Sequence, residues 1–247
     1  MAIKTPSEPS SEETRIAARC AEMIAQIEAE ARSTAAYTGR SRFDSRVLAA
    51  IKRVPRHEFV PASEKGMAYL NIALPIGHGQ TISQPYIVAL MTDLLALERL
   101  DAVVLEIGTG SGYQAAVLAQ MVRQVYSVET IPAIAAKAKA CFTRLGITNI
   151  EVRVGDGYYG WPEHAPFDGI VVTAAAPQIP PLLVEQLKPG GRLVIPLGRP
   201  LDRQDLTVAE KSEDNQLSLR SVLPVAFVPF QQGHSIEPVE QEGENSW

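Results

Sequence analysis

The stretch AVVLEIGTGSGY, residues 102–113, decides the fold of this chain. Its first half is almost continuously apolar, which is typical of a strand that is buried on both faces of a parallel sheet. Glycines at alternate positions, Gly108, Gly110 and Gly112, then permit a sharp turn. The segment YQAAVLAQMV, residues 113–122, follows directly and indicates a helix. We therefore predict a strand, a glycine-rich turn and a helix, in that order.

Strand and helix patterns alternate along the chain that follows. The predicted strands cover residues 124–129, 150–155, 167–175 and 192–198, and the predicted helices cover residues 131–146 and 181–187. Such alternation predicts a mostly parallel sheet with helices on both faces. Near the end, residues 206–213 and 220–230 are two consecutive strand patterns without a helix between them. This ending predicts an antiparallel C-terminal strand addition to the α/β fold.

The chain before the glycine-rich stretch is expected to be helical, with a loose end. Residues 1–12 are polar and rich in proline and serine, so we expect a disordered tail there. Apolar residues recur at helical spacing between residues 16 and 27. Asp44 is a suitable cap for a second helix, which Pro55 ends. The polar residues 231–247 are expected to form a second loose tail.

Bulk composition argues against several classes of function. The chain has 247 residues, of which 46% are hydrophobic, with a net charge of −5 and a pI of about 5.5. This acidic balance argues against nucleic-acid binding, which relies on lysine and arginine. No apolar stretch is long enough to span a membrane and no export leader is visible, so we expect a cytoplasmic protein without a membrane partner. Cys20 and Cys141 lie far apart, which favours reduced thiols over a disulfide or a metal site.

Acidic residues stand at the ends of three successive predicted strands. Glu106 precedes Gly108 by two positions, Glu129 ends the next strand, and Asp156 follows the third strand beside Gly157. The carboxyl ends of parallel strands meet at one edge of a sheet, where ligands bind. A single acid of this kind is more often a solvated strand end, but three in succession favour a ligand site.

The chemistry of these acids points to a nucleoside ligand without phosphates. A carboxylate at Glu106 disfavours a phosphate and suits an ammonium group. Glu129 lies about 20 residues further on, where an acid accepts both ribose hydroxyls. Asp156 suits an adenine amino group, and the Gly157 amide suits the adenine ring. Adenine, ribose and an amino acid describe S-adenosylmethionine, so the sequence predicts a methyltransferase.

The segment TAAAPQ, residues 173–178, bears on what is methylated. Enzymes that methylate nitrogen often carry Asn/Asp-Pro-Pro-aromatic at this place, and TAAAPQ has no comparable group to hold an amine. None of the four histidines is marked out as a base, although His78 lies near the suspected site. A carboxylate needs no base, because with a pKa of about 4 it is already ionised at neutral pH. The sequence therefore favours a carboxylate as the methyl acceptor.

The segment GHGQTISQPY, residues 77–86, admits two interpretations. Ser83 stands just before Pro85 and an apolar helical pattern, a position at which serine commonly caps a helix. A helix N-terminus with free amides and a hydroxyl is also suited to binding a carboxylate. The two roles are compatible, since the serine oxygen can accept from the backbone while its proton is donated elsewhere.

Several segments resemble those of the bacterial protein-L-isoaspartate O-methyltransferases. In order, within a match that runs from about residue 43 to residue 230, they are VPRHEFVP, NIALPIGHGQTISQPY, VLEIGTGSGYQAAVLA, YSVE, GDG, PFDGIVVTAAAPQIP, LKPGGRLVIPLG and FVPF. The segment GQTISQP is specific to that family. The resemblance implies a Rossmann-like methyltransferase fold with seven strands. It also implies methyl transfer from S-adenosylmethionine to the α-carboxyl of L-isoaspartyl residues in damaged proteins and peptides, which starts repair through a succinimide.

The resemblance also implies roles for individual residues. The family's active-site serine falls on Ser83, while Ile82, Val228 and Pro229 fall in the substrate pocket. The family's cofactor residues fall on the following positions: Thr81, Glu106, Gly108, Gly110, Gly112, Glu129, Thr130, Asp156 and Gly157. No metal is implied.

These observations divide the chain and leave two alternatives. We expect a tail at residues 1–12, a helical region with the substrate loop at 13–84, a methyltransferase domain at 85–230 and a tail at 231–247. A monomer is expected. The alternatives are a related methyltransferase acting on a different carboxylate or small molecule, and an inactive module that keeps only cofactor binding. The intact QTIS segment, residues 80–83, disfavours both, because either would leave the serine free to change.

Overall fold

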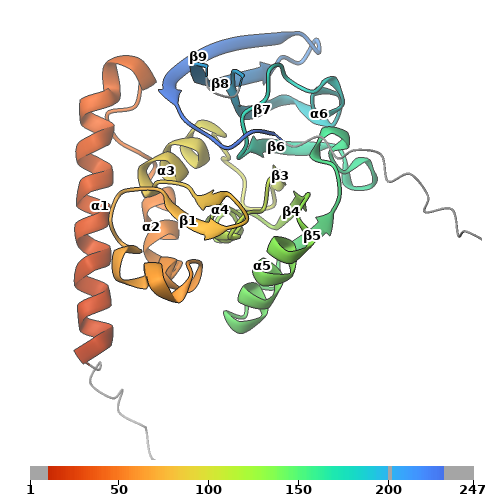
Figure 1. Cartoon of the computed structure of the whole chain (residues 1–247). Coiled ribbons are helices and arrows are strands. Elements are labelled where there is room, and N and C mark those ends of the chain that lie inside the picture. The colour runs from red at the N-terminus through yellow and green to blue at the C-terminus, as the bar shows by residue number, and fades with distance from the viewer. Residues whose placement is uncertain (1–10, 200–201, 231–247) are drawn as a thin grey trace, which may run out of the picture.

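A sheet of seven strands, in the order β5-β4-β3-β6-β7-β8-β9, runs through the described part of the protein (Figure 1). The computed structural model describes residues 11–199 and 202–230. The strands are β3 (Val103–Ile107), β4 (Gln124–Glu129), β5 (Ile150–Val154), β6 (Phe167–Val172), β7 (Leu187–Leu197), β8 (Gln204–Lys211) and β9 (Leu217–Val225). Strands β5, β4, β3, β6 and β7 run parallel to one another, whereas β8 pairs antiparallel with β7, and β9 pairs antiparallel with β8. The predicted α/β fold is confirmed.

The central strands are buried on both faces because their side chains alternate between two hydrophobic cores. In β3, Val104 belongs to the first core, whereas Val103 and Leu105 belong to the second. The helices are α1 (Ser11–Thr38), α2 (Ser45–Arg53), α3 (Pro85–Leu94), α4 (Tyr113–Ala119), α5 (Pro132–Arg144) and α6 (Pro181–Glu185). Helices α1 to α5 contribute to the first core, while the short α6 contributes to the second. Helices therefore cover both faces, as expected, but unequally.

Four short 3-10 helices complete the described secondary structure. They are η1 (Arg56–Glu58), η2 (Ala62–Met67), η3 (Gly157–Tyr159) and η4 (Pro162–His164). Trp161, between η3 and η4, is buried in the second core. The segment that contains η3 and η4 therefore contributes to the second core, together with α6.

Helix α1 stands at the edge of the molecule and packs against α2, α3 and β9 (Figure 1). Its buried apolar side chains recur at helical spacing and form one stripe: Cys20, Met23, Ile27 and Ala31. The helix begins at Ser11, so the last two residues of the expected N-terminal tail are helical instead. The rest of that tail, and the whole C-terminal tail, lie outside the described residues. The predicted cap of α2 is confirmed, because the Asp44 carboxylate accepts the amide of Arg46 at 2.8 Å.

Residues 74–82 form a hairpin where a flexible loop was expected. Strands β1 (Leu74–Gly77) and β2 (Gln80–Ile82) pair antiparallel. The two turn residues, His78 and Gly79, have φ angles of 54° and 69°, as a tight two-residue hairpin turn requires. The side chain of Ile76 lies beside Gly110, so the hairpin covers the glycine turn. This arrangement delivers the residues that follow β2 to the carboxyl edge of the sheet.

Gly112→Ala should destabilise the fold more than Gly146→Ala does. Both glycines have positive φ angles, 88° and 66°, but only Gly112 is crowded. A Cβ at Gly112 would stand 2.5 Å from Cζ of Phe142, whereas a Cβ at Gly146 meets nothing within 4 Å. We expect the backbone strain alone to cost Gly146→Ala about 1–2 kcal/mol of unfolding free energy. Overpacking should add about 1–3 kcal/mol in Gly112→Ala.

Urea denaturation of both variants measures this difference directly. Equal losses of unfolding free energy in the two variants would contradict the close contact between Gly112 and Phe142.

Candidate active site

A cavity opens at the carboxyl ends of β3, β4 and β6. Its walls come from the end of the β1–β2 hairpin, the glycine turn, the segment after β4 and the segment after β9. The predicted residues that line it are Thr81, Ile82, Ser83, Gly108, Gly110, Glu129, Thr130, Gly157, Val228 and Pro229. Glu106, Gly112 and Asp156 do not line it.

The carboxylate of Glu129 fixes the shape of the glycine turn. Its Oε2 accepts the Gly110 amide at 2.8 Å, and its Oε1 accepts the Ile131 amide at 3.0 Å. The residue is only 7% exposed, so these bonds hold the carboxylate at the cavity wall. Each carboxylate oxygen has a further lone pair, which leaves capacity to accept hydroxyl groups of a ligand.

Glu106 lies behind the glycine turn rather than in the cavity. It is 0% exposed, and its carboxyl accepts the hydroxyl of Ser127, which in turn lies 2.6 Å from the Thr109 hydroxyl. Burial raises the pKa of Glu106 to about 8. The carboxyl is therefore mostly protonated at neutral pH, and a direct contact with a ligand ammonium group stays a prediction.

Gly157 provides a close approach of backbone to the cavity. A Cβ at this position would stand 2.3 Å from Cγ2 of Ile107 and 3.3 Å from Cζ of Phe230. Any side chain here would fill the space between β3 and the segment after β9. The neighbouring Asp156 instead faces η3, where its carboxylate accepts the Tyr158 amide at 2.8 Å.

Ser83 lines the cavity and does not cap helix α3. The N-cap residue is Gln84, and its side chain makes no capping bond. Pro85 has no amide hydrogen, and the Tyr86 amide donates to Oδ1 of Asn71 at 2.9 Å. The expectation of free amides at this N-terminus is therefore wrong for the Tyr86 amide. Ser83 therefore lines the cavity without serving as the cap of α3.

A buried arginine holds the backbone at Ser83. The Arg56 side chain is 0% exposed, and its Nη2 donates to the Ser83 carbonyl at 2.8 Å. The same guanidinium donates to the carbonyls of Ala68 and Ile72 and lies 4.8 Å from the ring centroid of Tyr113. Burial lowers the Arg56 pKa to about 10, so it stays charged at neutral pH. Arg56 lies in the segment VPRHEFVP, which the sequence marks only by its resemblance to the family and which carries no local signal for this contact.

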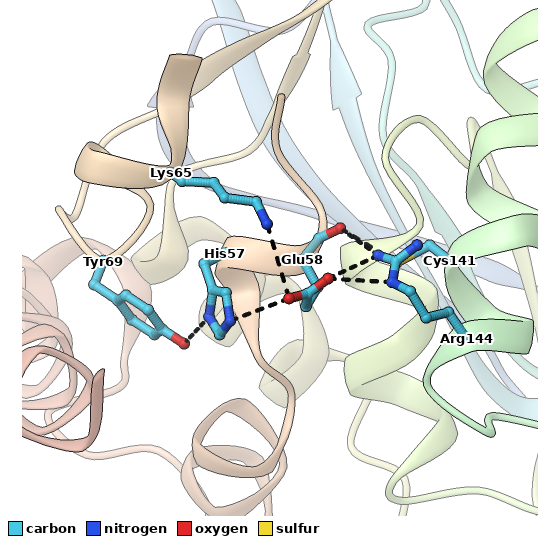
Figure 2. Close-up of polar contacts among 6 residues, drawn as sticks. All are labelled: His57, Glu58, Lys65, Tyr69, Cys141 and Arg144. Carbon is cyan, nitrogen blue, oxygen red and sulfur yellow. Dashed lines mark hydrogen bonds and ion pairs between the residues drawn. The ribbon is translucent and has the colours of Figure 1, made fainter. Parts of the chain in front are cut away.

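The residues beside Arg56 anchor η1 to two parts of the fold (Figure 2). His57 Nδ1 lies 2.8 Å from the Tyr69 hydroxyl, and burial lowers the His57 pKa so that the ring is neutral at pH 7. The Glu58 carboxylate pairs with Arg144 of α5 at 2.9 Å. The segment that positions Ser83 is thus tied to the helix that follows the predicted cofactor strand.

Eleven further residues line the cavity that sequence reasoning did not assign to the site: Gln80, Val88, Ile107, Ser111, Tyr113, Gln114, Val128, Ile131, Thr173, Ala174 and Phe230. Ser111 follows a glycine of the turn and was within reach of sequence reasoning. Thr173 opens the TAAAPQ segment, and its hydroxyl donates to the Gly108 carbonyl at 2.6 Å. That contact joins two strands that are far apart in the sequence, so the sequence offers no local signal for it.

Comparison with known proteins identifies the family. The model of the family described as protein-L-isoaspartate(D-aspartate) O-methyltransferase matches residues 36–235. Protein-L-isoaspartate O-methyltransferase 2 of Syntrophobacter fumaroxidans is 59% identical over 214 residues, which cover 87% of this chain and 86% of the relative. The chain belongs to the protein-L-isoaspartate O-methyltransferase family. Its activity is protein-L-isoaspartate O-methyltransferase activity, and S-adenosylmethionine is the methyl donor.

Further protein-L-isoaspartate O-methyltransferases support this assignment. Enzyme 1 of Cupriavidus necator is 53% identical over 93% of this chain and 88% of its own length. A solved enzyme of the same name aligns with a TM-score of 0.74 and 31% identity, over 85% of this chain and 65% of that one. A Plasmodium falciparum beta-aspartate methyltransferase, solved with S-adenosyl-L-homocysteine, aligns with a TM-score of 0.70 and 21% identity over 86% and 98% of the two chains, and shows the fold alone. None of the described helices combines the length and the hydrophobicity that crossing a membrane requires.

Glu106→Gln should remove a pH dependence of stability. Burial raises the folded-state pKa of Glu106 from its ordinary value of 4.5 to about 8. Between these values the folded protein keeps a proton that the unfolded chain has lost, so the free energy of unfolding falls as pH rises through this window. We expect the wild-type value to fall by about 1 kcal/mol per pH unit more than that of Glu106→Gln.

Urea denaturation at several pH values between about pH 5 and pH 8 measures the two slopes. Glu151→Gln, which changes an exposed carboxylate on β5, is the matched control and should keep the wild-type slope. Parallel slopes for the wild type and Glu106→Gln would contradict the buried, protonated carboxyl.

Proposed function

We propose that this cavity brings S-adenosylmethionine and the α-carboxylate of an isoaspartyl residue together. Glu129, Thr130, Gly157 and the glycine turn hold the methyl donor, with Thr81 beside it. Ile82, Val228 and Pro229 surround the acceptor, and Ser83 binds its carboxylate. The observation that carries this proposal is that Ser83, which does not cap α3, lines the same cavity as Glu129 and the glycine turn.

The lining fits the methyl donor in shape and in chemistry. The absence of a Cβ at Gly157 lets its backbone pack closely against Ile107 at the cavity wall, where a ligand ring can approach the backbone amide. The Glu129 carboxylate keeps accepting capacity for ribose hydroxyls. S-adenosylmethionine supplies a methyl group on a positively charged sulfur when it is bound. Among the described residues that line the cavity, Glu129 is the one with a charged side chain, and lysine and arginine are absent from the lining.

The chain's own residues orient the acceptor carboxylate, and none of them has to remove a proton from it. A carboxylate with a pKa of about 4 is already ionised at neutral pH, so no base is needed. The described lining contains no histidine, lysine or cysteine, in keeping with that requirement. The Ser83 hydroxyl donates a hydrogen bond that fixes the carboxylate, while Arg56 holds the Ser83 backbone through its carbonyl. Orientation of the two reactants therefore supplies most of the rate enhancement.

The proposed working form is a cytoplasmic monomer that acts on isoaspartyl proteins and peptides without a nucleic-acid or membrane partner. The net charge of −5 supports the absence of a nucleic-acid partner, because phosphate binding relies on excess positive charge.

Ser83→Ala should lower turnover on an isoaspartyl peptide while leaving stability and cofactor affinity near wild type. A hydrogen bond to a charged group contributes about 1.5–3 kcal/mol, so we expect a loss in kcat/KM of about 10- to 100-fold. Methyl transfer from labelled S-adenosylmethionine measures turnover, thermal denaturation measures stability, and calorimetric titration with S-adenosylhomocysteine measures affinity.

Asp44→Ala is the matched control, because Asp44 is a true helix cap. It should cost about 1 kcal/mol of stability and leave kcat/KM intact. Full turnover in Ser83→Ala would remove the serine from the proposed mechanism.

Glu129→Ala should weaken S-adenosylhomocysteine binding by roughly 1–3 kcal/mol, because it removes an acceptor for the ligand and for two backbone amides. Calorimetric titration measures the change in Kd. Glu151→Ala, at an exposed carboxylate one strand away on β5, is the control and should bind as the wild type does. If Glu129→Ala binds S-adenosylhomocysteine with wild-type affinity, Glu129 does not contribute to ligand binding.

A further inference from the structure

A second cavity also borders Ser83. Ser83, Thr81, Thr173 and Val228 line both cavities. We call the second cavity the α1 groove, because it lies between helix α1, the start of α3 and residues 223–228. Helix α1 and the end of β9 lie side by side at this place (Figure 1). A polypeptide whose isoaspartyl carboxylate is held at Ser83 has this groove next to it.

The α1 groove contains one fixed negative charge. Glu30, on α1, is the one charged side chain among the described residues that line it. Oε2 of Glu30 accepts from Nδ2 of Asn71 at 2.7 Å and from Nε2 of Gln84 at 2.9 Å. Both bonds end on the same oxygen, so Oε1 is left for a further donor. Because Gln84 directly follows Ser83, the charge is held next to the acceptor site.

The rest of the groove suits a long basic side chain. Ile87, Leu223 and Phe227 give it apolar walls. The methylene stems of lysine and arginine pack against such surfaces while their charged ends reach a polar partner. The fixed carboxylate of Glu30 in a groove with apolar walls therefore favours lysine or arginine over a neutral or acidic residue.

We propose that Glu30 binds a lysine or arginine side chain of the acceptor polypeptide, at a position adjacent to the isoaspartyl residue. The proposal rests on the proposed function, since it takes the acceptor carboxylate to lie at Ser83. It adds a preference for acceptor sequence that the methyl transfer itself does not require. The match to the family begins at residue 36, so Glu30 belongs to the part of α1 that precedes the matched region.

The test measures kcat/KM for isoaspartyl peptides that differ only in one flanking residue. Lysine, glutamine or glutamate is placed immediately before or immediately after the isoaspartyl residue, which gives six peptides. The enzymes are the full-length wild type, Glu30→Gln and Glu28→Gln. Glu30→Gln keeps an oxygen for Asn71 and Gln84 but removes the charge. Glu28 is exposed on the same helix and lies outside the groove, so Glu28→Gln is the matched control.

At low ionic strength we expect the wild type to prefer lysine over glutamate about tenfold at one of the two positions. Glu30→Gln should reduce that preference to about twofold or less, through loss of the lysine peptide and gain of the glutamate peptide. Glu28→Gln should keep the wild-type preference. About 0.5 M salt should weaken the wild-type preference as well, because it screens the pair.

Three results would overturn the proposal. A wild type that treats all six peptides alike has no basic subsite, and this result needs no folded variant. A Glu30→Gln enzyme that loses activity equally on every peptide would make Glu30 a structural support of the Ser83 segment only. If Glu28→Gln and Glu30→Gln change the preference for lysine over glutamate peptides equally, the preference comes from the overall negative charge of α1 and not from a contact with Glu30.

The same peptides separate this proposal from the one for Ser83. Ser83→Ala acts on the isoaspartyl carboxylate, so it should lower kcat/KM for all peptides while preserving the ratio of lysine to glutamate peptides. Full activity of Ser83→Ala would contradict the proposed role of Ser83. Loss of the flanking preference in Glu30→Gln, by contrast, tests only the proposed binding of a basic side chain in the α1 groove.

Discussion

The buried guanidinium of Arg56 is the contact on which the acceptor side of the site depends. A fully buried charge is costly unless it is hydrogen-bonded, and here the carbonyls of Ala68, Ile72 and Ser83 accept from Nε and Nη2, whereas Nη1 has no hydrogen-bond partner among the described residues. These three carbonyls come from a stretch that has little regular secondary structure apart from the β1–β2 hairpin. One cation therefore gathers the irregular backbone, and its contact with the Tyr113 ring joins that backbone to the start of α4.

The donor side of the site depends on a different kind of contact. Glu129 binds the amide of Gly110 across two adjacent parallel strands, so the turn after β3 takes its shape from the end of β4. Behind the turn, Glu106 is buried with Ser127 and contributes a neutral carboxyl rather than a charge. The cavity thus has one lining carboxylate, Glu129, which two backbone amides hold, and it is also lined by Ser83, whose carbonyl Arg56 holds.

Sequence reasoning succeeded where the deciding contact is local or follows from strand direction. Asp44 caps the helix that begins with the next residue, because the carboxylate reaches an amide two positions on. Gly108, Glu129 and Gly157 meet in one cavity because parallel strands end at one edge of the sheet. The same reasoning left open whether Ser83 caps α3, because it could not include Asn71, which takes the amide of Tyr86 instead.

The sequence by itself determined the alternation of strands and helices, the glycine turn after β3 and the family to which the chain belongs, since these depend on periodicity and on short contiguous motifs. Only the tertiary structure decided that Glu106 lies behind the turn, that Arg56 binds the Ser83 carbonyl and that Glu30 of α1 reaches the same segment. Each of these outcomes depends on residues that are far apart in the chain. Their burial and their hydrogen-bond partners are set by the path of the backbone, which local composition does not specify.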